Sequence, residues 1–256
     1  MSLQNMNINE RHSILQVPFN SLTMDETLQV LLDFLKKDSN HLVVTPNPEA
    51  VMLAQRDKDF LQVLQKADLV LPDGIGILLA AKWLKLNIPC RVPGCDITMA
   101  LLESVSDTSH NDANKYSCYL LGAAPGIAEL ARQNLQAKNI KILGARDGYF
   151  DDDMGITILN EIRELKPDIL IVGMGMPKQE LWALKHLHTL PCKITLCVGG
   201  TIDIMAGNVK RAPKIIRRLG FEWLYRFITQ PSRAKRMLDL PKFVLKVVQT
   251  SKHTFI

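Results

Sequence analysis

Short polar and glycine-rich motifs follow the apolar runs of this chain, and they carry the residues that could do chemistry. In chain order they read TPNPE, PDGIG, GAAPG, ARDGYF, GMGMPKQE and GGTID. Glycine-rich turns that lead into a helix expose backbone N–H groups at the positive end of the helix dipole, which suits a phosphate. Several such turns favour a nucleotide or another phosphorylated ligand, and the candidate contacts among them are Gly122, Gly175, Gly199, Gly200 and Asp203.

Asp73 stands between Pro72 and Gly74, where an apparently buried strand opens into a glycine turn. Two interpretations are open. Aspartate is a favoured N-cap, so Asp73 could cap a helix that starts near Ile75. A carboxylate at the mouth of a sheet could instead act as a general base, because an aspartate is ordinarily ionised at neutral pH.

Three further polar residues are candidates for the site, and two of them, Thr45 and Asn47, sit at the end of a predicted strand. Thr45 and Asn47 could orient a sugar, or they could form the turn that starts the next helix. Arg91 follows Asp73 by 18 residues. Its guanidinium could hold a diphosphate and stabilise leaving-group charge, or it could be a solvated loop arginine.

The later motifs offer ligand contacts and a metal alternative. Lys178 and Gln179 open a predicted helix, where they could meet a sugar or a diphosphate or simply lie on the surface. Tyr149 could stack on a base or fill the core. Asp151 and Asp153 have the D-x-D spacing that binds a divalent metal in many sugar-nucleotide transferases, but acidic residues are also favourable at a helix start. We expect no metal site.

Alternating strands and helices must position these motifs. The predicted strands span residues 41–44, 67–71, 117–122, 140–145, 168–175 and 193–200. Several of them are apolar throughout, as expected for parallel strands covered on both faces. Helices are predicted between them, with a capping box from Thr23 to Glu26 and proline at the first helical position at Pro48, Pro125 and Pro177. The fold class is therefore α/β: a Rossmann-like, mostly parallel sheet with helices on both faces, whose ligands bind beyond the carboxyl ends of the strands.

The composition excludes several classes of protein. Hydrophobic residues make up 47% of the 256 residues, which argues against disorder. The five cysteines form no C-x-x-C pair, so we expect reduced, mostly buried thiols in a cytoplasmic protein and no zinc site. We expect neither a secretory signal peptide nor a transmembrane segment. A P-loop is absent, and GMGMPK lacks the third glycine of the dinucleotide-binding motif.

The charge is unevenly distributed along the chain. From Lys210 onward, twelve Lys or Arg are opposed only by Glu222 and Asp239, so this segment carries +10, whereas residues 1–209 carry −5. We therefore expect an α/β body over 1–209 and a basic helical appendage over 210–256. Residues 213–230 read as one basic amphipathic helix with aromatics, including Arg217 and Trp223, which is typical of an anionic membrane surface. An ordinary C-terminal helix that packs on the core is the alternative.

The ordered series of motifs resembles the WecG/TagA/CpsF glycosyltransferases, glycosyltransferase family 26. The resemblance spans roughly residues 14–245 and rests on TPNPEAV, PDGIG, RVPGCD, DGYF, GMPKQE, GGTIDIMAGNVKRAP and FEWLYRFITQPSRAKR. It implies an inverting, metal-independent transfer of an N-acetylmannosamine-type sugar, with no cofactor, from a UDP-sugar donor to GlcNAc on an undecaprenyl-diphosphate acceptor. It also implies a peripheral location on the inner face of the bacterial cytoplasmic membrane.

The resemblance also implies roles for individual residues. The proposed base of the family falls on Asp73, and its active-site arginine falls on Arg91. Arginines placed to reach the lipid diphosphate fall on Arg226, Arg233 and Arg236. The donor sugar, the polysaccharide pathway and homo-oligomer formation stay open.

Two other classes of protein compete with this interpretation. A nucleic-acid-binding protein could use the same basic segment, but no recognised module is present and we expect no nucleic-acid partner. A nucleotide-dependent oxidoreductase could use a Rossmann-like sheet, but the dinucleotide-binding motif is missing.

Overall fold

The protein has an α/β fold with a six-stranded sheet, which confirms the predicted fold class. The structure is a computed structural model that describes residues 8–106, 116–218, 220–229 and 239–254. The sheet order is β4-β3-β8-β7-β5-β6. The pairs β3–β8, β8–β7, β7–β5 and β5–β6 are all parallel.

The chain divides into two compact units. Unit 1 comprises residues 1–26, 45–93 and 211–256, and unit 2 comprises 27–44 and 94–210. Helix α1 (Met24–Phe34) begins in unit 1 and continues in unit 2. The last part of unit 1 begins at Arg211, one residue after the predicted start of the basic appendage, and both the appendage and its membrane role stay predictions.

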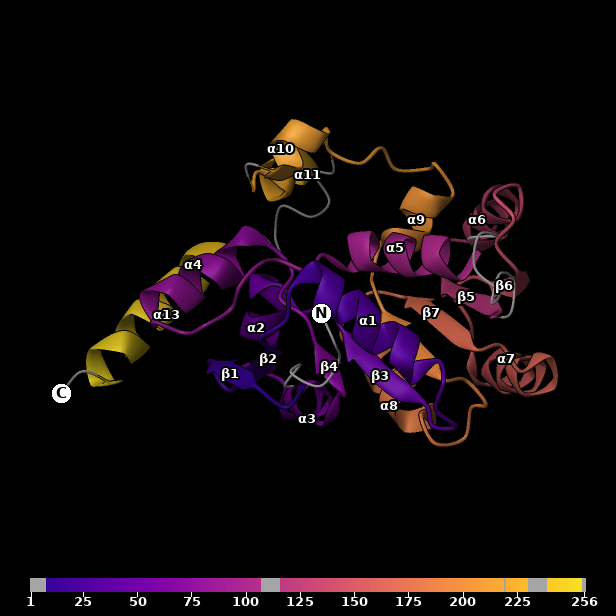
Figure 1. Ribbon diagram of the computed structural model, residues 1–256, viewed down its shortest axis with the longest axis horizontal. Helices are drawn as coiled ribbons and strands as arrows, with labels where there is room; N and C mark the ends of the chain where they lie inside the picture. Colours follow the sequence, from indigo (N-terminus) through magenta and orange to yellow (C-terminus); the bar gives the residue numbers. More distant parts are fainter. Residues whose placement is uncertain (1–7, 107–115, 219, 230–238, 255–256) are drawn as a thin grey trace. The chain divides into compact units, whose positions relative to one another are not determined.

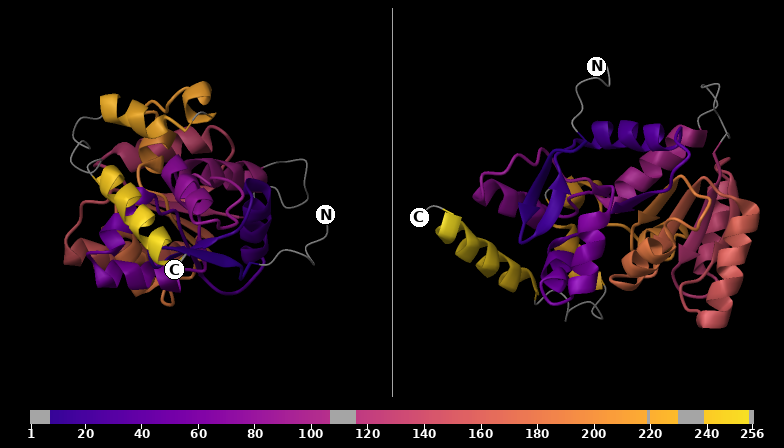
Figure 2. Two further views of the ribbon diagram at one scale, coloured as in Figure 1. Left: turned by 90° about the vertical axis from the view of Figure 1, so that its left-hand side faces the viewer. Right: turned by 90° about the horizontal axis from the view of Figure 1, so that it is seen from below.

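Unit 2 contains five of the six strands of the sheet, which are β3, β8, β7, β5 and β6. Its elements are β3 (His41–Val44), α5 (Gly94–Ser106), β5 (Cys118–Gly122), α6 (Ile127–Gln136), β6 (Ile142–Arg146), α7 (Asp152–Leu165), β7 (Ile169–Gly173), α8 (Lys178–His186), β8 (Ile194–Cys197) and α9 (Thr201–Met205). Helices α5, α6 and α9 lie on one face of β5 and β7, and α8 lies on the opposite face (Figure 1 and Figure 2). Strands β5, β7 and β8 are buried at every position, because both faces are covered.

Unit 1 contains an antiparallel hairpin that the sequence patterns did not predict. Its elements are β1 (Arg11–Ile14), β2 (Val17–Asn20), α2 (Pro48–Ala54), α3 (Lys58–Lys66), β4 (Leu69–Val70), α4 (Ile75–Trp83), α10 (Lys214–Arg218), α11 (Glu222–Thr229) and α13 (Asp239–Thr254). The buried Asn20 side chain accepts a hydrogen bond of 2.8 Å from the Val70 N–H. Arg11 donates from Nη2 to the carbonyl oxygens of Ala67 and Asp68, at 3.0 and 2.6 Å. The hairpin therefore holds the start of β4 through side chains as well as through packing.

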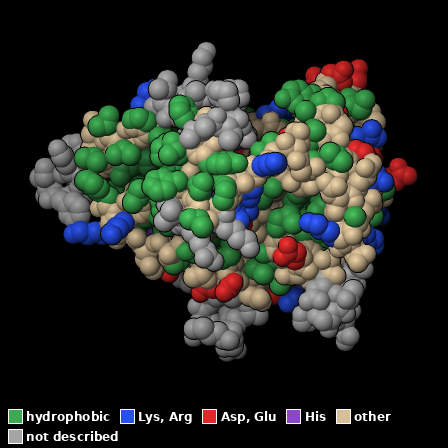
Figure 3. Space-filling view, turned by 90° about the horizontal axis from the view of Figure 1, so that it is seen from above, with side chains coloured by type: hydrophobic (Ala, Val, Ile, Leu, Met, Phe, Trp, Pro, Cys, Tyr) green, Lys and Arg blue, Asp and Glu red, His purple; other side chains and the backbone are tan. Residues whose placement is uncertain are grey.

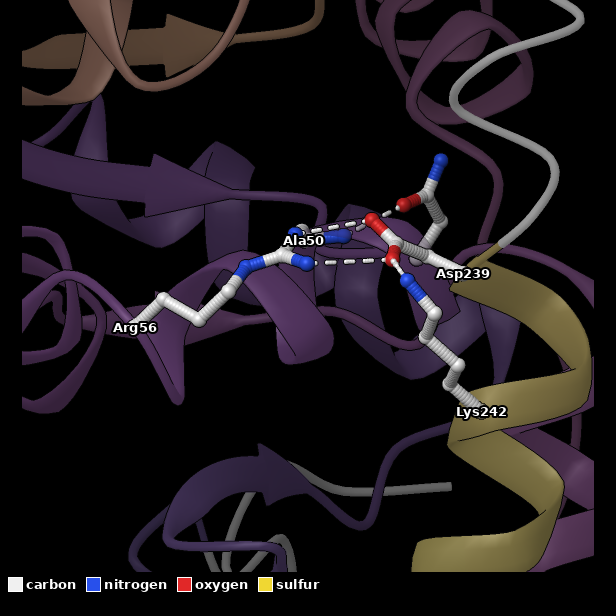
Figure 4. A network of polar contacts seen from close by, with 5 residues as sticks. Ala50, Arg56, Asp239 and Lys242 are labelled. Carbon is white, nitrogen blue, oxygen red and sulfur yellow. Dashed lines mark hydrogen bonds and ion pairs between the residues drawn. The ribbon is translucent and has the colours of Figure 1, made fainter.

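Helix α13 packs on α2 and α4 within unit 1. Asp239, at its first turn, accepts two hydrogen bonds from the Arg56 guanidinium, at 2.8 and 3.1 Å, and lies 3.6 Å from Lys242 Nζ (Figure 4). The hydrogen bonds from Arg56 lower the pKa of the Asp239 carboxyl below its ordinary value. A segment from the C-terminal part of the chain is thus anchored beside residues 48–83.

The structure corrects three local predictions. Residues 213–230 do not form one helix, because Gly220, with φ of 79°, separates α10 from α11. A Cβ at Gly220 would lie 2.9 Å from Cγ1 of Ile75, so the break brings the chain against the start of α4. Pro48 is at the start of α2 as predicted, but Pro125 precedes the N-cap Gly126 of α6, and Pro177 is itself the N-cap of α8.

The predicted capping box and the predicted reduced, mostly buried cysteines are confirmed. Thr23 and Glu26 form the reciprocal capping box of α1, with Thr23 N donating to Glu26 Oε2 at 2.8 Å and Glu26 N to Thr23 Oγ1 at 3.3 Å. All five cysteines are reduced, and four of them are buried. Within the described residues, no helix combines the length and hydropathy that crossing a bilayer requires.

Candidate active site

The four predicted catalytic residues come together in unit 1. Asp73 follows β4, and its N–H donates to the Pro46 carbonyl oxygen at 3.3 Å, which places it beside the Thr45–Asn47 turn. The Val92 N–H donates to the Pro72 carbonyl oxygen at 2.9 Å, which places Arg91 beside the same loop. Two backbone hydrogen bonds therefore gather three loops that are distant in the sequence.

Asp73 does not cap the helix that follows it. The N-cap of α4 is Gly74, with φ of 93° and ψ of 150°, and the cap has no side-chain hydrogen bond. The interpretation of Asp73 as the N-cap of α4 is therefore wrong. The carboxyl is partly exposed at the carboxyl end of a strand, where an open α/β sheet binds its ligands.

Thr45 and Asn47 are partly exposed beside Asp73. Asn47 is the N-cap of α2, and its Oδ1 accepts a hydrogen bond of 2.9 Å from the Ala50 N–H. The predicted turn-forming role of Asn47 is thus confirmed. That bond uses the carbonyl side of the amide, so the prediction that Asn47 meets a sugar now concerns its Nδ2 group. The sugar-orienting role of Thr45 stays a prediction.

Arg91 connects this loop to the C-terminal segment of unit 1. Its Nη2 donates to the backbone carbonyl oxygen of Arg217, the last but one residue of α10, at 2.6 Å. A guanidinium carries five N–H donors in a planar fork, so this bond is compatible with binding an anion as well. The interpretation of Arg91 as a merely solvated loop arginine is wrong.

The predicted ligand-binding loops of unit 2 are linked to one another by hydrogen bonds. The Gly148 N–H donates to the Ala123 carbonyl oxygen at 3.0 Å, which joins the loops after β5 and β6. Lys178 Nζ donates to the Gly148 carbonyl oxygen at 2.8 Å and lies 4.8 Å from the centroid of the Phe150 ring. Lys178 therefore ties the start of α8 to the loop after β6, and a ligand would have to compete for its ammonium group.

Gln179 joins the loops after β7 and β8. Its Oε1 accepts hydrogen bonds from the N–H groups of Gly175 and Gly199, both at 3.2 Å. The side chain is only 4% exposed, so Gln179 is not the surface residue that one interpretation expected. The expectation that these two turns present free N–H groups to a phosphate is corrected for Gly175 and Gly199, because Gln179 occupies both groups.

Glycines allow the strand ends of this unit to approach closely. A Cβ at Gly122 would lie 2.4 Å from the backbone carbon of Gly173, and a Cβ at Gly173 would lie 2.6 Å from the Gly199 carbonyl oxygen. A larger residue at position 122 or 173 would collide with the neighbouring backbone, so the packing of the sheet explains both glycines without any ligand. The contacts of Gly122 with a donor stay a prediction.

The remaining candidate contacts of unit 2 are accessible. Tyr149 is 77% exposed in the loop after β6, so the interpretation that it fills the core is wrong. Gly200 is the N-cap of α9, and Asp203 lies in the first turn of that helix, where Asn208 Nδ2 donates to Asp203 Oδ1 at 3.4 Å. An exposed tyrosine beside glycine turns is a suitable stacking surface for a base.

The predicted lipid-facing residues are described only in part. Arg217 Nε donates to the Ala212 carbonyl oxygen at 3.1 Å, and Trp223 on α11 is 42% exposed. Arg226 lies within α11, whereas Arg233 and Arg236 lie outside the described residues. The lipid-diphosphate roles of these residues stay predictions.

The D-x-D residues start a helix. Asp151 is the N-cap of α7, its Oδ1 accepts from the Met154 N–H at 2.9 Å, and Asp153 lies in the first turn. In the described part of the chain, no group of three or more His, Cys, Asp or Glu side chains is arranged to hold a metal ion. The helix-start interpretation of Asp151 is confirmed.

Sequence reasoning missed Glu180, the next residue after Gln179. Glu180 is 6% exposed, and its Oε1 accepts from Gln179 Nε2 at 2.6 Å. The signal was present in the sequence, because Glu180, Ala183 and Leu187 have the i, i+3, i+7 spacing of a buried helix face.

An open α/β sheet with polar and glycine-rich turns after its strands is typical of the Rossmann-like class of proteins, which bind ligands beyond the carboxyl ends of the strands. A match to the glycosyl transferase WecG/TagA/CpsF family spans residues 12–254. The chain therefore belongs to the WecG/TagA/CpsF family of glycosyltransferases, as the motif series predicted.

Named relatives resemble the chain over most of its length. It is 32% identical over 237 residues to a protein of Bacillus subtilis (strain 168), with 90% of each chain covered. It is 34% identical over 218 residues to a protein of Bacillus spizizenii, with 84% of this chain and 82% of the relative covered. It is 31% identical over 254 residues to a protein of Staphylococcus aureus (strain MRSA252), with 98% of each chain covered. All three are named N-acetylglucosaminyldiphosphoundecaprenol N-acetyl-beta-D-mannosaminyltransferase.

Proposed function

We propose that this protein transfers an N-acetylmannosamine-type sugar, N-acetylmannosamine or its uronic acid, from UDP to the GlcNAc of an undecaprenyl-diphosphate lipid. The observation that carries the proposal is the assembly of Thr45, Asn47, Asp73 and Arg91 around the Pro46–Asp73 and Pro72–Val92 backbone hydrogen bonds. Family membership and the names of the three relatives support the same reaction. Nothing in the fold or the comparisons favours an oxidoreductase or a nucleic-acid-binding protein.

In this proposal Asp73 is the general base. The Asp73 carboxylate takes the proton of the acceptor hydroxyl while the hydroxyl oxygen forms a bond to the anomeric carbon. The bond from the anomeric carbon to the β-phosphate oxygen breaks, and UDP leaves with the electron pair. Attack opposite the leaving group inverts the anomeric centre. Asp73 is suited to this task because it follows β4 at the carboxyl end of a strand, where an open α/β sheet binds its ligands.

Arg91 stabilises the charge that develops on the leaving diphosphate. Its backbone is held by the neighbouring Val92–Pro72 bond and its side chain by the Arg217 carbonyl oxygen. A cation that is already positioned needs little reorganisation when charge develops in the transition state. With an arginine available, we propose that the transfer needs neither a metal ion nor another cofactor.

We further propose that the basic C-terminal segment holds the protein on the inner face of the cytoplasmic membrane. Both of its acidic residues are already paired: Glu222 Oε1 lies 3.8 Å from Arg211 Nε, and Asp239 pairs with Arg56 and Lys242. Figure 3 shows hydrophobic side chains gathered on one face of the molecule. The exposed large apolar residues of α10, α11 and the turn between them are Ile215, Phe221, Trp223, Leu224 and Phe227. Apolar side chains combined with excess positive charge suit an anionic lipid surface.

A product assay tests the reaction directly. The protein would be incubated with a panel of UDP-sugars and a long-chain lipid-diphosphate-GlcNAc acceptor, and the product identified by mass. We expect one added N-acetylhexosamine or N-acetylhexosaminuronic acid, with release of UDP. Absence of transfer from every donor, while NAD or a nucleic acid stabilises the protein against heat, would contradict the proposal.

A further inference from the structure

Gln179 and Glu180 form a buried pair at the start of α8. Gln179 Oε1 accepts from the N–H groups of Gly175 and Gly199 at 3.2 Å, and Gln179 Nε2 donates to Glu180 Oε1 at 2.6 Å. The two side chains are 4% and 6% exposed. This pair, which we call the loop clamp, therefore joins the turn after β7 to the turn after β8.

The chemistry of an amide fixes the orientation of Gln179. Two backbone N–H groups face one end of the amide, so that end must be the oxygen. The NH₂ group must then point at Glu180, where it needs an acceptor because it is buried. Glu180 supplies that acceptor, so without Glu180 the native orientation of the amide would leave a buried NH₂ group without this acceptor.

Stability alone does not explain an acidic residue at position 180. Its Oε2 is buried and, within the described part of the chain, has no hydrogen-bond partner. Burial raises the pKa of the carboxyl to about 7, although the hydrogen bond from Gln179 opposes this shift. An apolar residue would pack on the same helix face without this penalty. Because a buried acid with an unsatisfied oxygen lowers the stability of the fold, its presence indicates a functional role for Glu180.

We propose that Glu180 is a positioning residue for the donor site, because its carboxylate holds Gln179 in the one orientation that links the Gly175 and Gly199 turns. This inference rests on the proposed function and on the sequence-based prediction that Lys178, after β7, and Gly200, after β8, contact the UDP-sugar. Glu180 does not touch the donor. It fixes the separation of two loops, and a small displacement of such loops weakens every contact that depends on both.

Two substitutions of Glu180 separate positioning from packing. Glu180→Leu removes the acceptor and keeps an apolar side chain of similar size. Glu180→Gln keeps an acceptor oxygen for Gln179 Nε2. The matched control is Asp168→Asn, because the Asp168 carboxylate also joins two backbone segments, accepting from Ser117 N at 2.8 Å and Ser117 Oγ at 3.0 Å, but precedes β7 at its amino end.

The measurements are UDP affinity by calorimetry, kcat and donor KM in the full-length protein, and amide hydrogen exchange at Gly175 and Gly199. We expect Glu180→Leu to raise the UDP Kd and the donor KM roughly 10- to 100-fold, with a smaller change in kcat, because displaced loops lose binding geometry. Exchange at both glycines should accelerate. Glu180→Gln should restore most of the affinity, and Asp168→Asn should lower stability without changing Kd.

The outcomes also separate this inference from the proposed function. A wild-type protein that binds no UDP would refute the proposed function and the positioning role with it. Normal UDP binding by Glu180→Leu would refute only the role of Glu180. Equal losses in Glu180→Leu, Glu180→Gln and Asp168→Asn would likewise overturn the inference, because they would show a general effect of destabilisation.

Discussion

The Arg91 guanidinium donates a hydrogen bond of 2.6 Å to the backbone carbonyl oxygen of Arg217, although 126 residues separate the two. The bond joins the loop beside Asp73 to helix α10 of the basic segment. Gly220, three residues after Arg217, packs against Ile75. The C-terminal segment therefore contacts the start of α4 as well as Arg91. The proposed leaving-group arginine and the proposed membrane-binding segment are thus parts of one connected structure in unit 1.

Substitution of Arg91 should affect both catalysis and the C-terminal segment. We expect Arg91→Ala to lower kcat roughly 10²–10³-fold, as loss of one preorganised donor does. Hydrogen exchange over residues 211–218 should also accelerate, because the bond to the Arg217 carbonyl oxygen is lost. Arg91→Lys keeps the charge without the planar fork and should recover only part of the activity. Full activity of Arg91→Ala would remove this residue from the mechanism.

Substitution of Asp73 tests the general base. We expect Asp73→Asn to keep the fold and the UDP affinity while transfer falls about 10²–10⁴-fold, the usual contribution of a positioned base. Asp57→Asn is the matched control, because Asp57 caps α3 by accepting from the Phe60 N–H at 2.9 Å, and asparagine caps equally well. Near wild-type turnover of Asp73→Asn would show that another group takes the proton.

The D-x-D residues should matter for stability and not for transfer. Asp151→Ala removes the N-cap of α7 and should lower the free energy of unfolding by about 1 kcal/mol. The Asp151→Ala/Asp153→Ala variant should keep its activity, and transfer by the wild-type protein should survive excess EDTA. Loss of activity in EDTA, with recovery on adding Mn²⁺ or Mg²⁺, would revive the metal interpretation.

The buried Glu180 carboxyl should make stability depend on pH. Its pKa rises from 4.5 to about 7 because burial disfavours the charged form. The folded protein therefore holds this proton more tightly than the unfolded chain, so the free energy of unfolding should fall as pH rises from about 4.5 to about 7. Urea unfolding at several pH values would measure this slope. Glu180→Gln should remove the contribution of this carboxyl to the slope, whereas Glu164→Gln, at an exposed position, should leave the slope unchanged. An unchanged slope in Glu180→Gln would show that the raised pKa does not belong to Glu180.

The basic segment should be tested by charge reversal in preference to deletion. Deletion from Arg211 would also remove α13, which packs on α2 and α4 and pairs with Arg56, so unit 1 itself should lose stability. We expect Arg226, Arg233 and Arg236 changed to Glu to weaken sedimentation with anionic liposomes and to abolish transfer to a long-chain acceptor, while UDP binding persists.

An equal change of net charge elsewhere provides the control for that experiment. Lys138, Lys141 and Lys185 are exposed in unit 2, and their replacement by Glu should leave membrane binding and transfer largely intact. Normal liposome binding and activity in the Arg226/Arg233/Arg236 variant would reduce the segment to a packing element.

The sequence by itself determined the six strands of the sheet and most of the helices of the body. Apolar runs such as residues 41–44 and 168–175 are long enough and uniform enough to identify buried parallel strands. Since ligands meet such sheets at the carboxyl ends of the strands, the motifs after each run were also the correct places to look for the site. The β1–β2 hairpin escaped because its strands are short and mixed in character, with Pro18 inside one of them.

Only the tertiary structure decided what the polar residues do. The sequence could not tell that Gly74 is the N-cap of α4 while Asn47 caps α2, because both Asp73 and Asn47 precede a helix. Nor could it show that Gln179 occupies the Gly175 and Gly199 N–H groups, or that Arg91 reaches Arg217. Hydrophobic periodicity is a local property that neighbouring residues determine, whereas each of these hydrogen bonds depends on where a distant segment is placed by the packing of the fold.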